Sequence, residues 1–351
     1  MPETLGHPAS RRASDGARPG AALLAEAKAI ADDHLFPSAG AVEALPIVPR
    51  ARLDPLAASG WFGFMVPAEQ GGLGLDRDDA LRAIELFASG CLTTTLVWIQ
   101  HIAGVMSACF GPEHIRDEWF EPLRSGACRA GIAFGGLIPG PPLLRATRST
   151  GGWTLDGSSP WVSGWGLVDM IVAAARTTDD QVVNVFVDAA ESPTLTAVPH
   201  RLFAANASAT VSLTVDHHFV PDHRVTGIQP FAGHAERDAA NLGLNGSLAL
   251  GVAARALDLM GPSALDEELV RVRRQREIAT AATLPSARAA IASFAVRATS
   301  ALMVDRGSSG VIAGNHAERL AREATFLLVF ATRPTIKARL LDVLGTDGAV
   351  P

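Results

Sequence analysis

The chain has 351 residues, of which 48% are hydrophobic and 19% are charged, so it can bury a large core. Its formal net charge is -6 at pH 7, so there is no overall basic field to attract nucleic acid or an anionic membrane. These values argue against a disordered chain and against a nucleic-acid-binding or membrane-binding protein.

The cysteine content indicates a reducing compartment. Cys91, Cys109 and Cys128 form an odd set without a CxxC pair. We expect reduced thiols in a cytoplasmic protein. Polar residues interrupt the most apolar windows, so no membrane-spanning helix is expected. Residues 1–20 mix arginines with Pro, Ser and Gly and lack an apolar stretch, which predicts a disordered tail rather than a signal peptide.

Helical periodicity dominates the first third of the chain. Apolar residues at helical spacing predict helices over 21–34, 53–59, 77–89, 93–110 and 112–123. Between the second and third of these, Pro67 and several glycines favour a tight loop over 60–76. We therefore predict an all-helical domain over residues 21–130.

The middle of the chain changes to strand-like patterning. Residues 151–162 are interpreted as two short strands joined by a turn at Asp156-Gly157, and a third strand follows over 170–175. Alternating residues predict further strands over 182–188, 195–198 and 208–220. The prediction for residues 131–230 is a middle β domain, a small antiparallel barrel or sandwich.

Tryptophan is concentrated in this region. Trp153, Trp161 and Trp165 are three of only six tryptophans in the chain, and Ser163 lies between two of them. Such residues on a sheet would make a flat apolar surface with a hydroxyl beside it, which could hold a planar, partly polar ring system. The alternative is a well-packed β-core in which Ser163 is simply hydrogen-bonded.

Helical periodicity returns in the last third. Ala-, Leu- and Arg-rich segments predict helices over 235–261, 264–282, 285–304, 316–331 and 334–344. They predict a C-terminal helical bundle over residues 235–346. The fold class is therefore α+β, in the order helical domain, β domain, helical bundle.

Several segments in this order resemble the acyl-CoA dehydrogenase superfamily of flavoproteins, from about residue 21 to 344. The motifs are GWFGFMVPAEQGGLGLD at 60–76, DGSSPWVSGWGLVDMIVAAART at 156–177, VDHHFVPDHRVTG at 215–227 and HAERLAREATFLLVF at 316–330. The resemblance implies the acyl-CoA dehydrogenase-like fold and FAD as cofactor. Each motif is weak alone, but their order and spacing are fairly specific.

The resemblance also implies contacts to the flavin. In the family, the tryptophan at the position of Trp161 lies against the isoalloxazine, and the hydroxyl at the position of Ser163 hydrogen-bonds the flavin N5. Where the family has a TEPxxGSD stretch, this chain has AFGGLIPGPP at 133–142. The backbone amides of Gly135 and Gly136 remain there as candidate donors.

The same resemblance indicates the positions at which the family has its catalytic base. Dehydrogenation of an acyl thioester requires a carboxylate that removes the α-proton. Counting from Arg322 and Glu323, the glutamate of the family falls at Ala331, and the base position used by some members falls near Asn241 and Leu242. None of these side chains can take a proton, so no catalytic residue is assigned.

Two phosphate-side motifs are also altered. The RxxFG motif, which contacts FAD of a neighbouring subunit in the family, has as its nearest substitute RVRRQR at 271–276. We interpret that segment as an exposed charged helix face. GSSG at 307–310 replaces a glycine loop, and it either faces phosphate oxygens or is an ordinary interhelix turn.

Other candidate residues have structural interpretations. Glu323 is expected in an ion pair with Arg319 or a neighbour. His101 is expected to be a hydrogen-bonded core histidine, although it could line a substrate channel. His217 and His218 are adjacent on a strand and therefore point to opposite faces, so no metal site is expected.

The sequence thus predicts a FAD-dependent oxidoreductase of acyl-CoA dehydrogenase type, acting on an acyl thioester or a related small molecule. Two alternatives remain: a non-catalytic subunit that pairs with a base-bearing paralogous dehydrogenase, and a flavin-dependent monooxygenase on the same fold. The expected protein is a cytoplasmic dimer or tetramer, either homo- or hetero-oligomeric.

Overall fold

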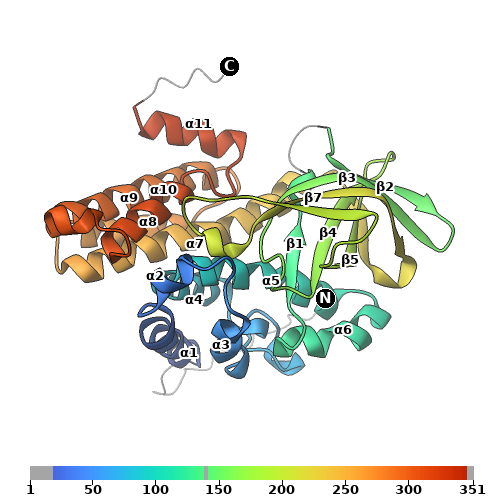
Figure 1. Ribbon diagram of the computed structural model, residues 1–351, viewed down its shortest axis with the longest axis horizontal. Coiled ribbons are helices and arrows are strands. Elements are labelled where there is room, and N and C mark those ends of the chain that lie inside the picture. The colour runs from blue at the N-terminus through green and yellow to red at the C-terminus, as the bar shows by residue number, and fades with distance from the viewer. Residues whose placement is uncertain (1–18, 138–140, 346–351) are drawn as a thin grey trace, which may run out of the picture.

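The computed structural model describes residues 19–137 and 141–345. Figure 1 shows N-terminal helices along one edge, a sheet at one end of the molecule and C-terminal helices at the other. This order of helices, sheet and helices confirms the predicted α+β fold class. Nearly all of the predicted tail and residues 138–140 of the AFGGLIPGPP segment lie outside the described residues.

Apart from α2, which the sequence did not predict, the N-terminal helices match the predicted ones closely. They are α1 (Pro19–Ala29), which continues into the π-helix Ile30–Leu35, α2 (Ala39–Glu43), α3 (Asp54–Ala58), α4 (Arg77–Gly90), α5 (Leu92–Phe110) and α6 (Glu113–Ser125). Asp76 caps α4 because its side chain accepts a hydrogen bond from the Asp79 N–H. Gly126, with φ of 75°, ends α6 in the left-handed conformation.

Two helices have the length and apolar composition of a membrane span, which the sequence interpretation did not anticipate. They are Leu92–Phe110 and Leu284–Val311, with mean hydropathy values of 1.2 and 1.3. In the structure 72% and 61% of these windows are buried inside the protein, as in core helices of a folded domain. Burial against protein therefore accounts for their apolar character.

In the described part of the chain the sheet has eight strands. They are β1 (Ala130–Ala133), β2 (Leu144–Ser149), β3 (Gly152–Val162), β4 (Met170–Arg176), β5 (Gln181–Asp188), β6 (Leu195–Pro199), β7 (Val211–Pro221) and β8 (Val225–Pro230). Their order is β6-β7-β3-β2-β4-β5-β8, with β1 paired to β4 outside this path. Most pairs are antiparallel as predicted, but β1 and β2 both run parallel to β4.

The predicted turn at Asp156-Gly157 is wrong. Residues 152–162 form one continuous strand, and a β-bulge interrupts its pairing with β7 between Leu155 and Gly157. A Cβ on Gly157 would lie 2.0 Å from the Leu143 carbonyl oxygen, so the glycine permits close strand approach rather than chain reversal. The actual hairpin joins β2 to β3 at Gly151, which has φ of 75°.

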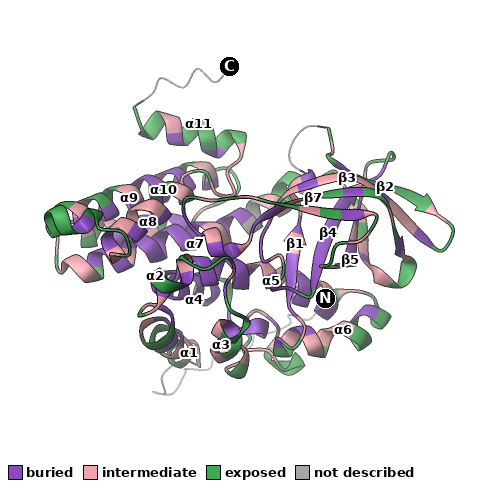
Figure 2. Ribbon diagram, in the orientation of Figure 1, coloured by how far each residue is buried: buried purple, intermediate pink, exposed green. Residues whose placement is uncertain are grey.

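Five α-helices follow the sheet between residues 231 and 345. They are α7 (His234–Met260), α8 (Leu265–Glu277), α9 (Leu284–Arg306), α10 (His316–Leu327) and α11 (Pro334–Val343). Figure 2 shows much of α4 and α7 buried, and buried residues of α4, α7, α9 and α10 form one apolar core that both helical units share. The sheet has a separate core between its strands. The end of β3 nearest the helices is where the candidate site lies.

Candidate functional site

Trp161 is presented to solvent by a second bulge in β3. The register between β3 and β7 shifts between Ser159 and Val162, and Trp161 within it has φ of 62°. Such a conformation is costly for a bulky residue and persists only where the surroundings impose it. The Trp161 side chain is 61% exposed as a result. An apolar ring held outward by a strained backbone is a candidate ligand contact.

The other two tryptophans do not join this surface, so the predicted three-tryptophan face is wrong. Trp153 and Trp165 are partly buried and pack against the sheet core. The neighbour of Trp161 is instead His200, whose ring centroid lies 5.1 Å away with an interplanar angle of 34°. The Nε2 atom of His200 is 2.8 Å from Ser212 Oγ, which fixes the imidazole against β7.

Ser163 begins a buried line of hydroxyl groups. Its Oγ is 2.8 Å from Thr210 Oγ1, which is 2.8 Å from Ser208 Oγ. The backbone joins the same segments, because the Gly164 N–H donates to the Ser208 carbonyl at 2.7 Å. Ser163 is therefore hydrogen-bonded, as one of the two sequence interpretations expected.

Gly135 and Gly136 pack beneath the same end of β3. A Cβ on Gly135 would lie 2.4 Å from the Pro160 carbonyl oxygen, and a Cβ on Gly136 would lie 2.6 Å from Leu144 Cβ. No larger residue fits either position without backbone movement. The structure thus places all four predicted flavin contacts at one end of one strand, and their roles toward a flavin stay predictions.

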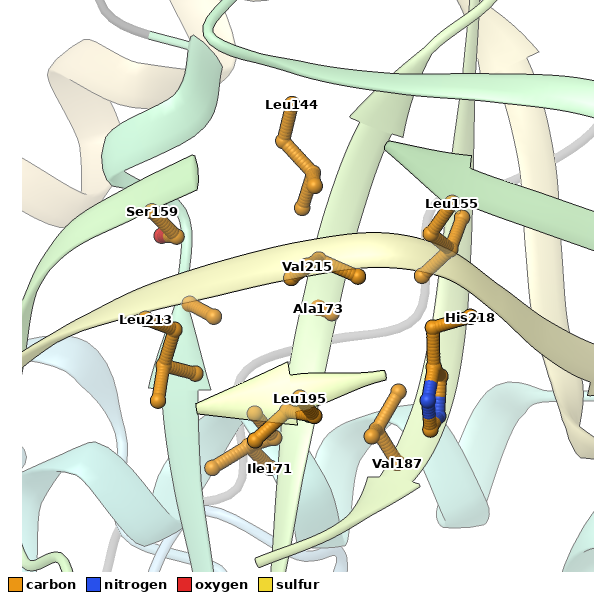
Figure 3. Close-up of a pocket in the computed structure, with 11 residues that line it drawn as sticks. Leu144, Leu155, Ser159, Ile171, Ala173, Val187, Leu195, Leu213, Val215 and His218 are labelled. Carbon is orange, nitrogen blue, oxygen red and sulfur yellow. The ribbon is translucent and has the colours of Figure 1, made fainter. Parts of the chain in front are cut away.

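A cavity between the described strands is too small for a ligand. Figure 3 shows the side chains that line a small cavity between the strands, among them Ser159 and His218. The cavity has a volume of about 10 Å³, close to the minimum that holds a single water molecule. A ring system does not fit this cavity, whereas the exposed Trp161 offers a contact on the outside of the sheet.

The two predicted base positions are linked by a buried cation. Arg288 of α9 donates through Nη1 to the Leu242 carbonyl at 2.7 Å and through Nη2 to the Phe330 carbonyl at 3.2 Å. Phe330 immediately precedes Ala331, which has φ of 49°. The described residues thus present a guanidinium next to Ala331 and Leu242; the side chain of Asn241 lies outside the described residues.

Arg288 differs from the other buried arginines. Arg129, Arg255, Arg276 and Arg319 each lie within salt-bridge distance of a carboxylate. No such partner accompanies Arg288 within the described ranges 19–137 and 141–345, although its side chain is only 5% exposed. Burial, with a smaller effect of Arg333, lowers the pKa of Arg288 to about 10, so the group is still charged at neutral pH.

Arg322 connects the candidate site to the C-terminal helices. Its Nη1 donates to the Phe203 carbonyl at 2.8 Å and to Glu43 Oε1 at 2.7 Å, and its Nε donates to Glu318 Oε2 at 2.7 Å. These hydrogen bonds raise the pKa of Arg322 above its ordinary value. Since Phe203 lies between His200 and the Ser208–Thr210 hydroxyls, the loop that carries them is fixed to α10.

The predicted ion pair of Glu323 is confirmed. Arg319 Nη1 donates to Glu323 Oε1 at 2.7 Å, and both side chains are almost fully buried. Burial raises the pKa of Glu323, while the charge of Arg319 opposes that effect. The pair lies within α10, so its geometry fits the structural role that the sequence favoured over a base role.

The exposed-face interpretation of RVRRQR holds only for part of the segment. Arg271 and Arg274 are exposed, at 64% and 70% of their side-chain area. Arg273 and Arg276 instead turn inward toward Glu85 of α4, and Arg276 is only 2% exposed. The helical period of α8 places some of its arginines on the solvent face and others on the core face. The same run of charged residues therefore contains both exposed and buried arginines.

GSSG is part of a local turn at the end of α9. Residues 307–311 form a short 3-10 helix, in which Ser309 Oγ donates to the Arg306 carbonyl at 2.8 Å. Asn315 Nδ2 donates to the Ser309 carbonyl at 3.2 Å. Of the two sequence interpretations, these contacts match the interhelix turn.

His101 is a hydrogen-bonded core histidine, as expected. Its Nε2 is 2.8 Å from the Leu123 carbonyl oxygen, and its Nδ1 accepts from the Ala130 N–H at 3.0 Å. Both contacts suit the neutral ring with the proton on Nε2. Burial lowers the pKa of His101 to about 4, with smaller effects of Arg129 and Asp169.

This pKa gives a testable pH dependence. The unfolded chain binds a proton at His101 near its ordinary pKa of 6.5, whereas the folded chain resists protonation down to about 4. Stability from this group is therefore present above pH 6.5 and falls as the pH drops toward 4, by up to about 1.4 kcal/mol per pH unit. Urea unfolding across this range should show a shallower dependence in His101→Gln than in the natural chain. Equal slopes would contradict the assignment.

His217 and His218 point away from one another, as predicted. His218 Nδ1 is 2.8 Å from Thr194 Oγ1, whereas His217 is 81% exposed. His217 groups with Asp156 and Asp216, and their ligand atoms lie within 4.8 Å of one another. All three are at the surface and their hydrogen bonds satisfy one another, so the group carries no metal assignment.

Sequence reasoning missed several residues of this region. His200, Ser208 and Thr210 come from the β6–β7 connection, and Arg288 comes from α9. The hydroxyl-rich run from Asn206 to Thr210 before a strand was a weak signal for a polar contact. Nothing in the local sequence distinguishes Arg288 from an exposed helical arginine.

Comparison with known proteins places this architecture in one class. The family model for the acyl-CoA dehydrogenase N-terminal domain matches residues 20–127. Benzylmalonyl-CoA dehydrogenase of Aromatoleum aromaticum is 28% identical over 237 residues, 64% of this chain and 63% of that protein. The human mitochondrial short-chain specific acyl-CoA dehydrogenase is 25% identical over 248 residues, 67% of this chain and 60% of that protein.

Solved structures agree with this fold. A glutaryl-coenzyme A dehydrogenase in complex with glutaryl-CoA superposes with a TM-score of 0.78 at 18% identity, covering 96% of this chain and 98% of that one. The fold is thus that of acyl-CoA dehydrogenase structures. Residues 20–127 therefore match the acyl-CoA dehydrogenase N-terminal domain in sequence, and the curated relatives at 25–28% identity are acyl-CoA-dependent enzymes of that kind. The matches span less than two thirds of the length of the first curated relatives.

The residues at the end of β3 are compatible with a flavin ring. Trp161 offers an exposed aromatic side chain outside the sheet, and His200 lies at its side. Ser163 offers a hydroxyl in a nearly dry setting, with 7% of its surface exposed. A planar apolar ring with polar edge atoms matches both groups. These contacts concern the flavin ring of the cofactor and not its phosphate groups.

Proposed function

We propose that this chain is a FAD-binding oxidoreductase of acyl-CoA dehydrogenase type that acts on an acyl thioester or a related small molecule. The single observation that carries the proposal is the exposed, left-handed Trp161 beside the buried Ser163 hydroxyl. The family-model match over residues 20–127 supports it, and one structural relative, a glutaryl-CoA dehydrogenase of Mycobacterium smegmatis, is described in complex with FADH2.

The residues have separate tasks in this proposal. When bound, the flavin would supply the hydride-accepting chemistry. Trp161 would contact the flat face of the ring, and the Ser163 hydroxyl would donate a hydrogen bond to the flavin N5. The close packing of Gly135 against Pro160 would fix the bulge that carries Trp161. Burial of Ser163 strengthens the hydrogen bond because water competes weakly there.

A carboxylate base is absent from the expected position at Ala331. Arg288 next to it would favour negative charge at this place, such as a carboxylate or an enolate oxygen of a substrate. We therefore expect a substrate whose reaction does not require an enzyme carboxylate at position 331 to remove a proton.

The contribution of Trp161 can be measured through FAD affinity. Ring stacking on an aromatic side chain contributes about 1–3 kcal/mol, so Trp161→Ala should weaken FAD binding by about 5- to 150-fold. The matched control is Phe219→Ala, which removes a half-exposed aromatic ring from β7 at the opposite end of β3. Equal FAD dissociation constants for Trp161→Ala and the natural chain, measured by fluorescence titration, would contradict the proposed ring site.

A non-catalytic subunit is the second candidate function, and the charge at Arg288 favours it. A guanidinium in place of a base suits a chain that supplies structure and part of a flavin site to a base-bearing paralogue. Co-expression with such a dehydrogenase, followed by size-exclusion chromatography, tests it. Elution of the two proteins as separate species would contradict the subunit assignment.

A further inference from the structure

The three hydroxyl groups of Ser163, Thr210 and Ser208 form a chain of hydrogen bonds that runs from the end of β3 to the short 3-10 helix Asn206–Ser208, which contacts α5. Both oxygen-oxygen distances are 2.8 Å, and the residues are 7%, 4% and 0% exposed in that order. We propose that Thr210 and Ser208 are positioning residues that keep the hydroxyl proton of Ser163 directed outward, to an acceptor atom of a bound ring. This inference rests on the proposed flavin site.

The number of protons on the three hydroxyls determines the direction of the hydrogen bonds between them. Three hydroxyls carry three protons, and the two hydrogen bonds between them use two. The remaining proton belongs to one of the three groups. At Ser208 or Thr210 it would be a buried donor that has no further acceptor within residues 19–137 and 141–345, which is unfavourable. At Ser163, the outermost group, it can reach a ligand.

The proton order that follows is Ser208 to Thr210 to Ser163 to ligand. Ser208 donates to Thr210, Thr210 donates to Ser163, and the Ser163 proton is free for an acceptor. Since each bond polarises the next, the line makes Ser163 a better donor than an isolated serine. No covalent bond changes in this arrangement.

The backbone fixes the spacing of the line. Ala205 and Ala209, on either side of Ser208, both adopt positive φ values of 54° and 46°. Such conformations are strained for alanine and persist because the surroundings impose them. The Trp165 N–H donates to the Ala209 carbonyl at 3.2 Å and thereby holds the end of β3 against this segment. The oxygen positions are therefore set before a ligand binds.

The ligand class that matches is a planar ring whose edge carries an acceptor nitrogen or carbonyl close to the aromatic face on Trp161. The flavin N5 is such an acceptor. In 5-deaza-FAD a C–H group replaces N5, so the analogue keeps the ring and the phosphates but cannot accept this hydrogen bond. The ratio of the two dissociation constants isolates the contact from the rest of binding.

The experiment measures that ratio by equilibrium titration of the full chain. The natural chain should bind FAD about 5- to 10-fold more tightly than 5-deaza-FAD, the effect of one hydrogen bond in a dry site. Ser163→Ala and Thr210→Val should bring the ratio close to one, whereas Thr210→Ser should keep it. The control Thr154→Val breaks the Ser149–Thr154 hydroxyl pair, 2.7 Å apart at the other end of β3, and should leave the ratio unchanged.

The outcomes separate the two claims. FAD binding with an unchanged ratio in Thr210→Val overturns the positioning role and leaves the flavin site standing. A ratio of one in the natural chain shows that Ser163 donates no such bond, which also overturns the inference. No binding of either compound contradicts the flavin site and the inference together. Ser208→Ala, expected to lower the ratio partly, provides the same test if Thr210→Val does not fold.

Discussion

Glu85→Ala is expected to lower the free energy of unfolding by about 3–5 kcal/mol, because it leaves the buried Arg276 and the partly buried Arg273 without their carboxylate. Glu85 is 1% exposed, and its Oε1 accepts from Arg273 Nε at 2.8 Å and from Arg82. Arg276 Nη1 lies 3.5 Å from its Oε2, and that arginine is also nearly fully buried. One carboxylate on α4 thus holds two arginines of α8.

The matched control is Glu121→Ala. Glu121 pairs with Arg124 at 2.8 Å, but its side chain is 66% exposed, so the loss should be no more than about 1 kcal/mol. Urea unfolding followed by circular dichroism measures both variants. A loss below about 1 kcal/mol for Glu85→Ala would show that water reaches the cluster, which borders a cleft of about 330 Å³.

Ala331→Glu alone is expected to leave acyl-CoA dehydrogenation at background. A positioned general base contributes about 10²- to 10⁴-fold, and the new carboxylate should not supply it. Two features of the structure oppose it. Ala331 has φ of 49°, which a longer side chain disfavours, and Arg288 is bound to the preceding carbonyl. An ion pair with Arg288 would lower the pKa of the new glutamate and weaken it as a base.

The double variant Ala331→Glu with Arg288→Gln separates these effects. It removes the guanidinium and should raise the pKa of Glu at position 331 toward its ordinary range, while Arg288→Gln alone should remain inactive. Turnover of acyl-CoA substrates with an artificial electron acceptor measures all three variants. Strong activity from Ala331→Glu alone would contradict this account, since it would show a complete pocket that lacked only its base.

The sequence predicted the helices and the fold class well because their signals are local. Apolar residues repeat at helical spacing through Arg77–Gly90 and Leu284–Arg306, and the caps at Asp76 and Gly126 are ordinary ones. The turn at Asp156-Gly157 was wrong for a physical reason. Asp-Gly favours turns, but a glycine is also required here because β2 approaches closely. The dipeptide alone does not show whether its glycine forms a turn or permits a close contact between strands.

The candidate site was only half visible in the sequence. Trp161 and Ser163 stand in one motif, whereas the Thr210 partner of Ser163 is 47 positions away. The inward arginines of α8 were missed for the same reason, because Arg273 meets Glu85 across 188 positions. Charge runs look alike whether their partners are water or a buried carboxylate. Tertiary contacts of this kind require the folded chain.

The proposed function depends on flavin binding by the ring site at Trp161 and Ser163. The most direct measurement is the visible absorption spectrum of the purified full chain after incubation with FAD and removal of free cofactor by size exclusion. We predict a yellow protein whose flavin absorption in the blue elutes with the polypeptide. A folded protein that stays colourless after this reconstitution would contradict the central claim.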